Sequence, residues 1–310
     1  MSSKISVAIA TYNGEKYIEQ QLLSILEQTR PVDEVIICDD RSGDGTAELI
    51  QEFIREKSLE DKFIFSVNEE NLGYASNFVN ALRKTTGDYI LFCDQDDIWV
   101  PDRVEKMIGV LESHPEAELI GSEFEPFKCS EDAPDPHKWE LATFRNDESL
   151  EKLSFNSANI FIGCQGCTMA MRRSFLDAVD SYWYKGWAHD EFVWKLALCR
   201  DSLYFYHKVT MKRRLHSTNV TLHTEHENEK RLKYLRDLKK SHERTKKYVL
   251  ENGGDKEKIV LLDRHIKATQ MRINLIENKK LLNFFRLFAY TDCYHKMRSI
   301  PVELMMAFKA

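Results

Sequence analysis

Short apolar runs alternate with helical patterns along the first hundred residues. The runs Ile5–Ala10, Val35–Cys38, Phe63–Val67 and Tyr89–Cys93 have the length and composition of β-strands. The second and fourth runs are continuous and apolar, which is typical of strands that are covered on both faces. Because strand–helix–strand repetition produces right-handed crossovers, the pattern predicts an α/β fold with a mostly parallel sheet and helices on both of its faces.

Four helices are expected between and after these strands. Their apolar stripes are Ile18, Leu22 and Ile25; Leu49, Ile50, Phe53 and Ile54; Phe78 and Leu82; and Val104, Met107, Ile108 and Leu111. Pro101 is expected to open the fourth helix, where its missing N–H costs little. Residues 124–146 contain three prolines and no clear period, which predicts a long surface loop.

The pattern becomes helical from about Glu225. Gly253-Gly254 are expected to stop a first helix there. Five residues then recur at three, four and seven positions and predict a seam that packs on another helix: Ile259, Leu262, Ile266, Ile273 and Ile276. We therefore expect a body over residues 1–224, with a strand-rich half to about 100 and a second half from 101 to 224, and a helical tail over 225–310, which ends in a short helix near Pro301.

Charge separates the same two units. The chain of 310 residues carries −6, but residues 225–310 hold 20 Lys and Arg against 12 Asp and Glu, a net charge of +8, which leaves −14 for residues 1–224. An acidic body argues against a nucleic-acid partner. Seven scattered cysteines, no signal peptide at the start and no apolar run of roughly 20 residues favour a reduced, cytoplasmic protein.

Carboxylates gather where the predicted strands end. Asp39 and Asp40 follow the second strand, and Asp94-Gln95-Asp96-Asp97 follows the fourth. Because carboxyl ends of parallel strands meet at one edge of a sheet, these groups repel one another unless a cation lies among them. Carboxylate oxygens are hard ligands that suit Mg²⁺ or Mn²⁺.

The first strand ends in Thr11-Tyr12-Asn13-Gly14, which is not a Gly-x-Gly-x-x-Gly turn, and the chain holds no Gly-x-x-x-x-Gly-Lys loop. Any nucleotide phosphate is therefore expected to be held by the metal, as suits a nucleotide-sugar donor whose leaving diphosphate gains charge. Tyr12 is a candidate to stack on the base, and Asp40 a candidate to accept a base N–H. Turn and helix capping is the alternative for Asp39 and Asp44, and the preferred one for Asp44.

Four segments, in this order, resemble the family 2 glycosyltransferases, which have the Rossmann-like GT-A fold and invert the anomeric centre. They are Ile9–Gly14, Cys38–Thr46, Asn71-Leu72-Gly73 and Asp94–Trp99, within a resemblance over about residues 4–220. The resemblance implies donor contacts from Thr11, Tyr12, Asn13, Asp40, Asn71, Asp94, Gln95 and Arg214, and metal ligands at Asp94, Asp96 and His216. Arg41 departs from the family pattern, which often has Gly there.

The resemblance also implies a catalytic base about 95 residues after the metal motif, where Trp187 is followed by His189-Asp190-Glu191. Asp190 is the candidate, because an acceptor hydroxyl needs a carboxylate to take its proton. His189, Glu191 and Trp187 are candidates for the acceptor side. The alternatives are a capping or solvent-facing role for Glu191 and a core position for Trp187.

The basic segment Arg214-Leu215-His216-Ser217-Thr218-Asn219 resembles the Arg-x-His-x-x-Asn segment of the family. It places Arg214 for pairing with phosphate oxygens and His216 for the metal shell, whereas a structural role is the alternative for His216. Cys164 and Cys167 form a Cys-x-x-Cys without a second pair. We interpret it as a strand or turn beside the acceptor rather than as a metal or redox motif.

The main functional hypothesis is an inverting, metal-dependent transfer of a hexose from UDP-glucose or a similar donor to a glycan or glycoprotein sugar. In motif form the chain is similar to rhamnosyl- and glucosyltransferases of bacterial surface glycans, and its tail resembles modules that glycosylate serine-rich adhesins. The alternatives are a dTDP-rhamnose-dependent rhamnosyltransferase and a non-catalytic nucleotide-sugar-binding scaffold. For the tail, we favour binding of an acceptor or a second copy. Packing on the body is one alternative, and peripheral contact with an anionic membrane through its basic residues and Phe284, Phe285 and Phe288 is the other.

Overall fold

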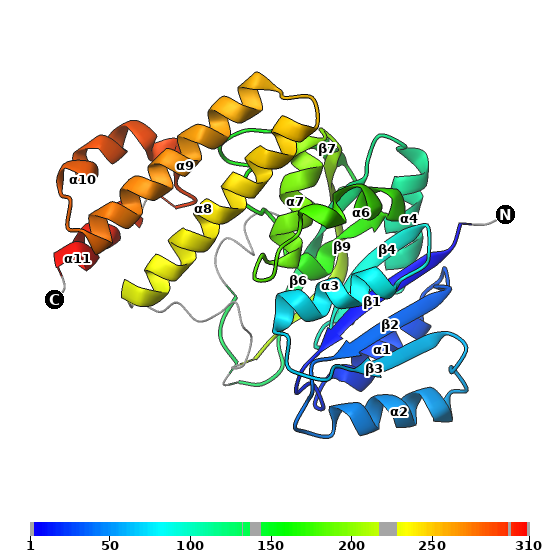
Figure 1. Ribbon diagram of the computed structural model, residues 1–310. Helices are drawn as coiled ribbons and strands as arrows, with labels where there is room; N and C mark the ends of the chain where they lie inside the picture. The colour runs from blue at the N-terminus through cyan, green and yellow to red at the C-terminus, as the bar shows by residue number, and fades with distance from the viewer. Residues whose placement is uncertain (1–2, 132, 137–143, 217–227, 297–298, 309–310) are drawn as a thin grey trace.

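The computed structural model describes residues 3–131, 133–136, 144–216, 228–296 and 299–308. Within these residues nine strands form one sheet in the order β3-β2-β1-β4-β8-β6-β9-β5, with β7 paired to β9 (Figure 1). The strands are β1 (Ile5–Thr11), β2 (Glu34–Asp39), β3 (Phe63–Val67), β4 (Tyr89–Asp94), β5 (Ile98–Trp99), β6 (Leu119–Lys128), β7 (Leu150–Lys152), β8 (Ala170–Arg172) and β9 (Leu203–Leu215).

The four strands that the apolar runs predict are present and parallel to one another. The rest of the sheet is more mixed than we expected. β8 is antiparallel to β4 and β6, β5 and β7 are antiparallel to β9, and β6 is parallel to β9. A strand as short as β8 has too few residues for its sequence pattern to predict how it pairs. Its direction is therefore set by the packing of the chain.

Helices cover both faces of the sheet, as predicted. The helices of the body are α1 (Ile18–Leu26), α2 (Thr46–Glu56), α3 (Tyr74–Lys84), α4 (Arg103–Ser113), α6 (Arg173–Val179) and α7 (His189–Cys199), with short 3₁₀ turns η1 (Gly166–Thr168) and η2 (Asp180–Tyr182). α1, α2 and α4 bury their apolar stripes with one face of the sheet, and α3, α6 and α7 with the other. Alternate residues of β1 point into the two cores, with Val7 and Ile9 on one side and Ala8 on the other.

The prediction of a loop over residues 124–146 is wrong for its first residues. Residues 124–128 are the end of β6, which runs parallel to β9 and contains register shifts around Glu123. These irregularities break the alternation of inward and outward residues that would have identified a strand. Pro101 does not open the fourth helix, because α4 begins two residues later, at Arg103.

The tail consists of α8 (Asn228–Glu251), α9 (Lys256–Glu277), α10 (Leu282–Leu287), the 3₁₀ segment η4 (Phe288–Cys293) and α11 (Ser299–Phe308). Gly253 and Gly254 end the first helix as predicted, and both have positive φ angles, 100° and 64°. Leu262, Ile273 and Ile276 of the predicted seam are buried. None of the described helices is both long and apolar enough to cross a lipid bilayer.

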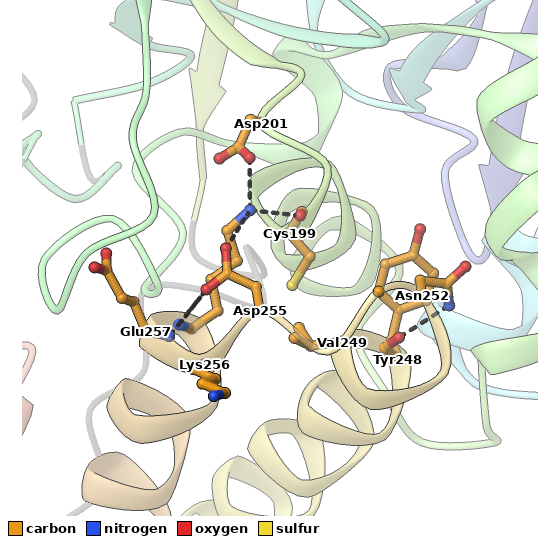
Figure 2. Close-up of a pocket in the computed structure, with 10 residues that line it drawn as sticks. Cys199, Asp201, Tyr248, Val249, Asn252, Asp255, Lys256 and Glu257 are labelled. Atoms are coloured by element: carbon orange, nitrogen blue, oxygen red, sulfur yellow. Dashed lines mark hydrogen bonds and ion pairs between the residues drawn. The ribbon is translucent and has the colours of Figure 1, made fainter.

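The tail packs on the body along α7. Tyr248 of α8 belongs to the core on that face of the sheet, and Leu238, Val249 and Leu262 share a second cluster with Ile160 and Phe161. A cavity of about 520 Å³ lies where α7 and α8 end and α9 begins (Figure 2). Across this junction the Lys258 ammonium donates to the Cys199 carbonyl oxygen (2.8 Å) and to Asp201 (2.6 Å). Packing on the body, one of the three roles considered for the tail, is therefore observed.

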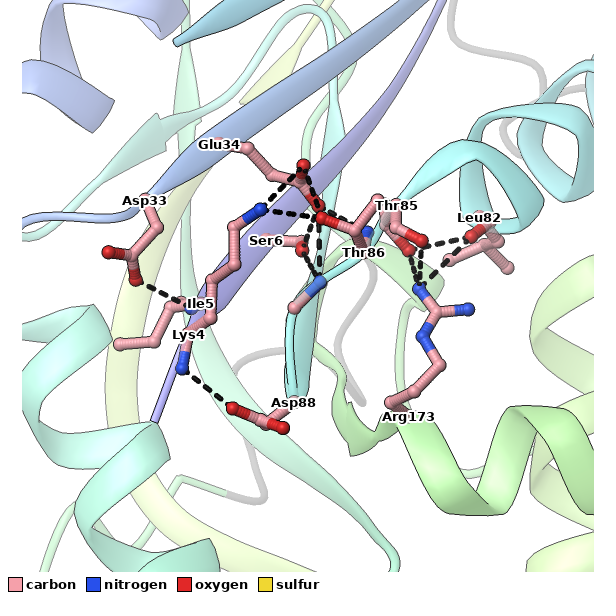
Figure 3. A network of polar contacts seen from close by, with 11 residues as sticks. Lys4, Ile5, Ser6, Asp33, Glu34, Leu82, Thr85, Thr86, Asp88 and Arg173 are labelled. Carbon is pink, nitrogen blue, oxygen red and sulfur yellow. Dashed lines mark hydrogen bonds and ion pairs between the residues drawn. The ribbon is translucent and has the colours of Figure 1, made fainter. Parts of the chain in front are cut away.

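A polar network joins the strands at the edge of the sheet where β1 and β2 begin (Figure 3). Glu34 is 4% exposed, and its carboxylate accepts hydrogen bonds from the Ser6 hydroxyl (2.5 Å), the Thr86 hydroxyl (2.9 Å) and the Thr86 and Gly87 backbone N–H groups. Burial by itself would raise the pKa of Glu34, but the bonds from Ser6 and Thr86 outweigh burial and lower this pKa below its ordinary value of 4.5. Glu34 therefore joins β1, β2 and the turn before β4.

We expect Glu34→Gln to lower the free energy of unfolding by about 1–3 kcal/mol at pH 7, because an amide cannot accept all of these hydrogen bonds. A carboxylate whose pKa is lower in the folded state contributes its stability above pH 4.5 and loses it as the pH falls below that value. The gap between variant and wild type should therefore shrink in acid. Urea unfolding across the pH range measures it, and the exposed Glu60→Gln is the control. Equal stability of E34Q and wild type at pH 7 would contradict the role of this network.

Candidate active site

Side-chain hydrogen bonds join the loops that follow β1 and β2. The Thr11 hydroxyl donates to Asp39 (2.9 Å), and the Asn13 N–H donates to the Ser42 hydroxyl (2.8 Å). The Gly43 N–H in turn donates to the Asn13 side-chain oxygen (2.8 Å). Thr11 is 1% exposed. Thr11, Asn13 and Asp39 therefore shape these loops, and the capping alternative for Asp39 agrees with its contacts.

Asp40 holds the segment Asn71-Leu72-Gly73 against the end of β2. Its carboxylate accepts the Leu72 N–H (2.7 Å), the Gly73 N–H (2.8 Å) and the Asn68 amide (2.9 Å). Asn71 donates to the Asp40 carbonyl oxygen (3.1 Å). Asp40 is 2% exposed, so the structure gives it a positioning role that its place in the sequence did not reveal.

Two turn residues after β2 account for the local geometry. Arg41 has a φ of 64°, which lies in the left-handed region that favours Gly. Its guanidinium donates to the Glu69 carbonyl oxygen (3.1 Å). Asp44 accepts the Thr46 N–H (3.1 Å) at the start of α2, which is the preferred capping role. Arg41 thus adopts the turn conformation at a position where the family often has Gly.

Tyr12 offers its ring to solvent. Its side chain is 50% exposed, whereas its backbone is fixed on both sides by the Gln95 amide, which accepts the Tyr12 N–H (2.8 Å) and donates to the Tyr12 carbonyl oxygen (3.0 Å). Because an exposed ring on a fixed backbone is prepared to stack on a planar ligand, Tyr12 keeps its place as a candidate base-binding residue. Gln95 contacts Tyr12 and supports it.

The acidic motif after β4 brings Asp94 and Asp96 near Asp190, which comes from α7. Burial, with the negative charges of Asp96 and Asp190, raises the pKa of Asp94 to about 7. The Asp96 carboxylate contacts Nε2 of His216 at 2.7 Å. The three residues of the predicted metal set therefore lie together, and His216 is 8% exposed.

A second buried group lies beside this set. Asp97 is 2% exposed and accepts the Arg214 N–H (3.0 Å). One ligand atom each from Asp94, Asp97 and Cys167 lies within 4.8 Å of the others. Burial raises the pKa of the Cys167 thiol well above its ordinary value, and the hydrogen bond from this thiol lowers the pKa of Asp94 and of Asp97.

The donor set fits a hard divalent cation. Carboxylates that raise one another's pKa are stabilised by a positive charge placed among them, and carboxylate oxygens with one imidazole nitrogen suit Mn²⁺ or Mg²⁺. Asp94, Asp96 and His216 are the residues that would hold the ion.

Two arginines that the sequence did not single out lie next to the carboxylates. Arg213 is 6% exposed and lowers the pKa of Asp94, opposing burial. Arg103 is fully buried, and its guanidinium donates to the Cys167 carbonyl oxygen (2.7 Å) and the Thr210 hydroxyl (2.5 Å). Burial lowers the pKa of Arg103 to about 10, so it remains charged at neutral pH beneath the acidic motif.

Arg214 holds the acidic motif in place. Its guanidinium donates to the Asp96 carbonyl oxygen (2.8 Å) and to Gln20 (2.5 Å), and it lies 4.8 Å from the ring centres of both Tyr17 and Phe127. Arg214 is 7% exposed. These contacts favour a positioning role over direct pairing with phosphate. Ser217, Thr218 and Asn219, which continue this segment, lie outside the described residues.

Asp190 lies in the first turn of α7. One carboxylate oxygen accepts the Glu191 N–H (2.7 Å), and no other hydrogen bond to Asp190 is formed within the described part of the chain. A methyl group at Gly166 would lie 3.0 Å from the Asp190 β-carbon and 3.4 Å from its second oxygen. Gly166, in the turn η1 of the predicted Cys-x-x-Cys segment, thus lets the backbone pack closely against Asp190.

His189 and Trp187 lie in the core, which corrects their assignment to the acceptor side. Trp187 is 1% exposed, which agrees with the core position given above as the alternative for this residue. The His189 ring stacks on Phe78 with centres 3.9 Å apart, and neither of its nitrogens has a partner within the described residues. Burial lowers the pKa of His189. These two side chains support α7 instead of presenting a surface to a sugar.

Glu191 connects α7 to the tail. Its carboxylate accepts a hydrogen bond from the Lys195 ammonium (2.6 Å) and from the Ser241 hydroxyl of α8 (3.0 Å). Lys195 is fully buried and also donates to Ser241 (2.7 Å). Burial lowers the pKa of Lys195, and Glu191 opposes this. Glu191 is therefore neither free nor solvent-facing, and the residue next to Asp190 is held by the tail.

The comparisons with known proteins define the class of this protein. A family model described as "Glycosyl transferase family 2" matches residues 6–179, more than half of the chain. The chain therefore belongs to the family 2 glycosyltransferases.

Among curated relatives, the dTDP-rhamnosyl transferase RfbG of Shigella flexneri is 39% identical over 106 residues, which cover 33% of this chain and 36% of RfbG. The protein CgeD of Bacillus subtilis is 24% identical over 202 residues, covering 62% of this chain and 45% of CgeD. For these two and three further relatives, the chain spans between 33 and 45% of the relative's length.

Solved structures show the same fold over nearly the whole chain. S. aureus TarS 1–349 in complex with UDP is 18% identical with a TM-score of 0.59, covering 94% of this chain and 80% of that one. The mannosyltransferase PcManGT of Pyrobaculum calidifontis in complex with GDP-Man and Mn²⁺ is 17% identical with a TM-score of 0.54, covering 99% and 86%. The predicted GT-A architecture with C-terminal helices is confirmed.

We expect Lys195→Met to lower the free energy of unfolding by about 2–4 kcal/mol, because it leaves Glu191 and Ser241 without their buried partner. Chemical denaturation measures the change, and Lys185→Met, which removes an exposed lysine from the same region, is the control. A K195M protein as stable as wild type would show that this ion pair does not hold α7 to α8.

Proposed function

We propose that the protein is an inverting glycosyltransferase that depends on a divalent cation and moves a hexose from a nucleotide sugar, UDP-glucose or a similar donor, to a hydroxyl of a glycan or glycoprotein sugar. The observation that carries this proposal is the convergence of Asp94, Asp96 and Asp190. These carboxylates come from two distant segments and lie near enough that, with burial, the negative charges of Asp96 and Asp190 raise the pKa of Asp94.

The donor is assigned to the half of the body over residues 1–100. Tyr12 stacks on the nucleotide base, and Gln95 keeps its backbone in place. Asp40 and Asn71 shape the loop that borders the base, and the contacts of Asp40 support this indirect role more strongly than a direct bond to the base. This assignment agrees with the exposure of Tyr12 and the burial of Asp40.

The diphosphate is assigned to the acidic motif. Asp94, Asp96 and His216 would hold a divalent cation, which would supply positive charge to stabilise the leaving diphosphate. Arg214 fixes the motif through the Asp96 carbonyl oxygen, and Arg213 adds positive charge close to Asp94. That PcManGT was solved with GDP-Man and Mn²⁺ supports this arrangement.

Asp190 is proposed as the catalytic base, and the acceptor is assigned to the half over residues 101–224. One oxygen of Asp190 is held by the Glu191 N–H, and the other, which receives no hydrogen bond among the described residues, is assigned to the acceptor. An acceptor hydroxyl placed there loses its proton to that oxygen as it attacks the anomeric carbon, and the bond to the diphosphate breaks on the opposite side.

Two alternatives remain for the function. The identity with the dTDP-rhamnosyl transferase RfbG supports dTDP-rhamnose as the donor, whereas TarS was solved with UDP. A scaffold that binds a nucleotide sugar without turnover would not need Asp190 to have an oxygen free of other bonds. This difference favours an enzyme.

We expect Asp96→Ala and Asp190→Asn each to lower transfer by about 10²–10⁴-fold while folding persists. The donor panel is UDP-glucose, UDP-N-acetylglucosamine, UDP-galactose and dTDP-rhamnose, each tested with Mn²⁺ and with a chelator, and scored for hydrolysis and transfer. D96A should also lose metal-dependent nucleotide binding in calorimetry, whereas D190N should keep it.

The exposed Asp61→Asn serves as the matched control and should keep full activity. Unchanged turnover in both active-site variants would refute the proposal. Metal-dependent binding without product from any donor would instead support the scaffold.

A further inference from the structure

An aromatic face lies at the end of the tail. The backbone is helical from Leu281 through α10 to Phe288, and Leu281, Phe285 and Phe288 recur at four and three positions, which places them on one side of this helix. All three are exposed, as is Leu282: Leu281 is 40% exposed, Leu282 61%, Phe285 68% and Phe288 57%. The rings of Phe285 and Phe288 both contact Phe284, at 5.5 and 5.2 Å between ring centres. We call residues 281, 282, 285 and 288 the tip face.

The tip face is fixed in its outward position. On the other side of α10, Leu287 is fully buried and Asn283 is 7% exposed, and Asn283 donates to the Met271 carbonyl oxygen of α9 (3.4 Å). Phe284 packs against the cluster around Ala268 and Leu287. Since the inner side of α10 is already anchored, Phe285 and Phe288 are left exposed among the described residues, and such exposed rings favour a binding surface.

Positive charge surrounds the tip face. Residues 278–310 contain six Lys and Arg and two Asp and Glu. Asp292 is paired with Arg264 (2.6 Å), and the buried Glu303 is paired with Arg272 (2.7 Å). Lys279, Lys280 and Arg286 are exposed and lie within a few residues of the aromatic side chains in the sequence. The tip therefore combines apolar rings with basic side chains at their border.

We propose that the tip face binds an anionic lipid membrane surface. A helix with aromatic and leucine side chains on its outer side and Lys and Arg beside them is suited to lie in the interface of a bilayer, with its rings among the acyl chains and its cations at the phosphates. Lysine is depleted in protein–protein interfaces, so a lysine-bordered face favours lipid over a protein partner.

The position of the tip fits this role. Figure 1 shows α10 at the end of the tail farthest from the sheet, and the body joins the tail at α7. A membrane at α10 therefore leaves the carboxyl edge of the sheet accessible. This inference is independent of the proposed function, because it rests on no residue of the candidate active site.

The test is flotation of the full chain with phosphatidylcholine vesicles, with and without phosphatidylglycerol. We expect binding to the anionic vesicles only, and a fall of about tenfold or more for Phe285→Ser with Phe288→Ser, since two large rings lose their apolar environment. Leu250→Ser with Val260→Ser is the matched control, because these side chains are similarly exposed (55% and 68%) on α8 and α9. Lys279→Gln with Lys280→Gln should weaken binding and its salt dependence.

Analytical sedimentation of the same variants measures their oligomeric state, which distinguishes binding of lipid from binding of a second copy of the chain. Absence of binding to anionic vesicles at low salt, or equal binding by F285S/F288S and the control, overturns the proposal. A dimer in solution that F285S/F288S alone disrupts overturns it in favour of self-association. Donor hydrolysis without vesicles should be the same in F285S/F288S and wild type, so this test does not depend on the outcome for Asp96 and Asp190.

Discussion

Repulsion between carboxylates is the constraint on which the rest of this structure depends. Burial, together with the negative charges of the neighbouring carboxylates, raises the pKa of Asp94 and of Asp97. The chain partly offsets this repulsion with Arg213 beside the motif and with the fully buried Arg103 beneath it. The remaining negative charge is what makes the edge suited to a cation and to the diphosphate of a donor.

The tail is part of the same arrangement, because it holds the helix that carries Asp190. Lys195 is buried between Glu191 of α7 and Ser241 of α8, next to His242 and His265, whose pKa values burial lowers. With both histidines neutral, the Lys195 ammonium is paired to the Glu191 carboxylate. A displacement of α8 would thus be transmitted to α7 within one residue of the proposed base.

Much of the site could be predicted from single residues, because their meaning is local. Asp94 and Asp96 follow a buried strand, so topology places them at the carboxyl edge, whereas Asp190 in the first turn of α7 was located only by the resemblance to the family's acidic motif. Asp40, Trp187 and His189 were harder to predict because a sequence motif does not tell which bonds a side chain already makes. Lys195 could have been noticed as a charge inside the apolar run Phe192–Leu198, whereas nothing in the sequence around Arg103 marks it as buried.

By itself the sequence determined the parallel half of the sheet, the stripes of the helices and the residue types of the acidic edge, since periodicity and strand ends depend on near neighbours. Only the tertiary structure decided the direction of β8, the strand at residues 124–128 and the partners of Arg214, Glu191 and Asp40. Those features depend on contacts between residues far apart in the chain. Such contacts exist only once the chain has folded, and they decide whether a polar side chain is free for chemistry or already committed to the structure.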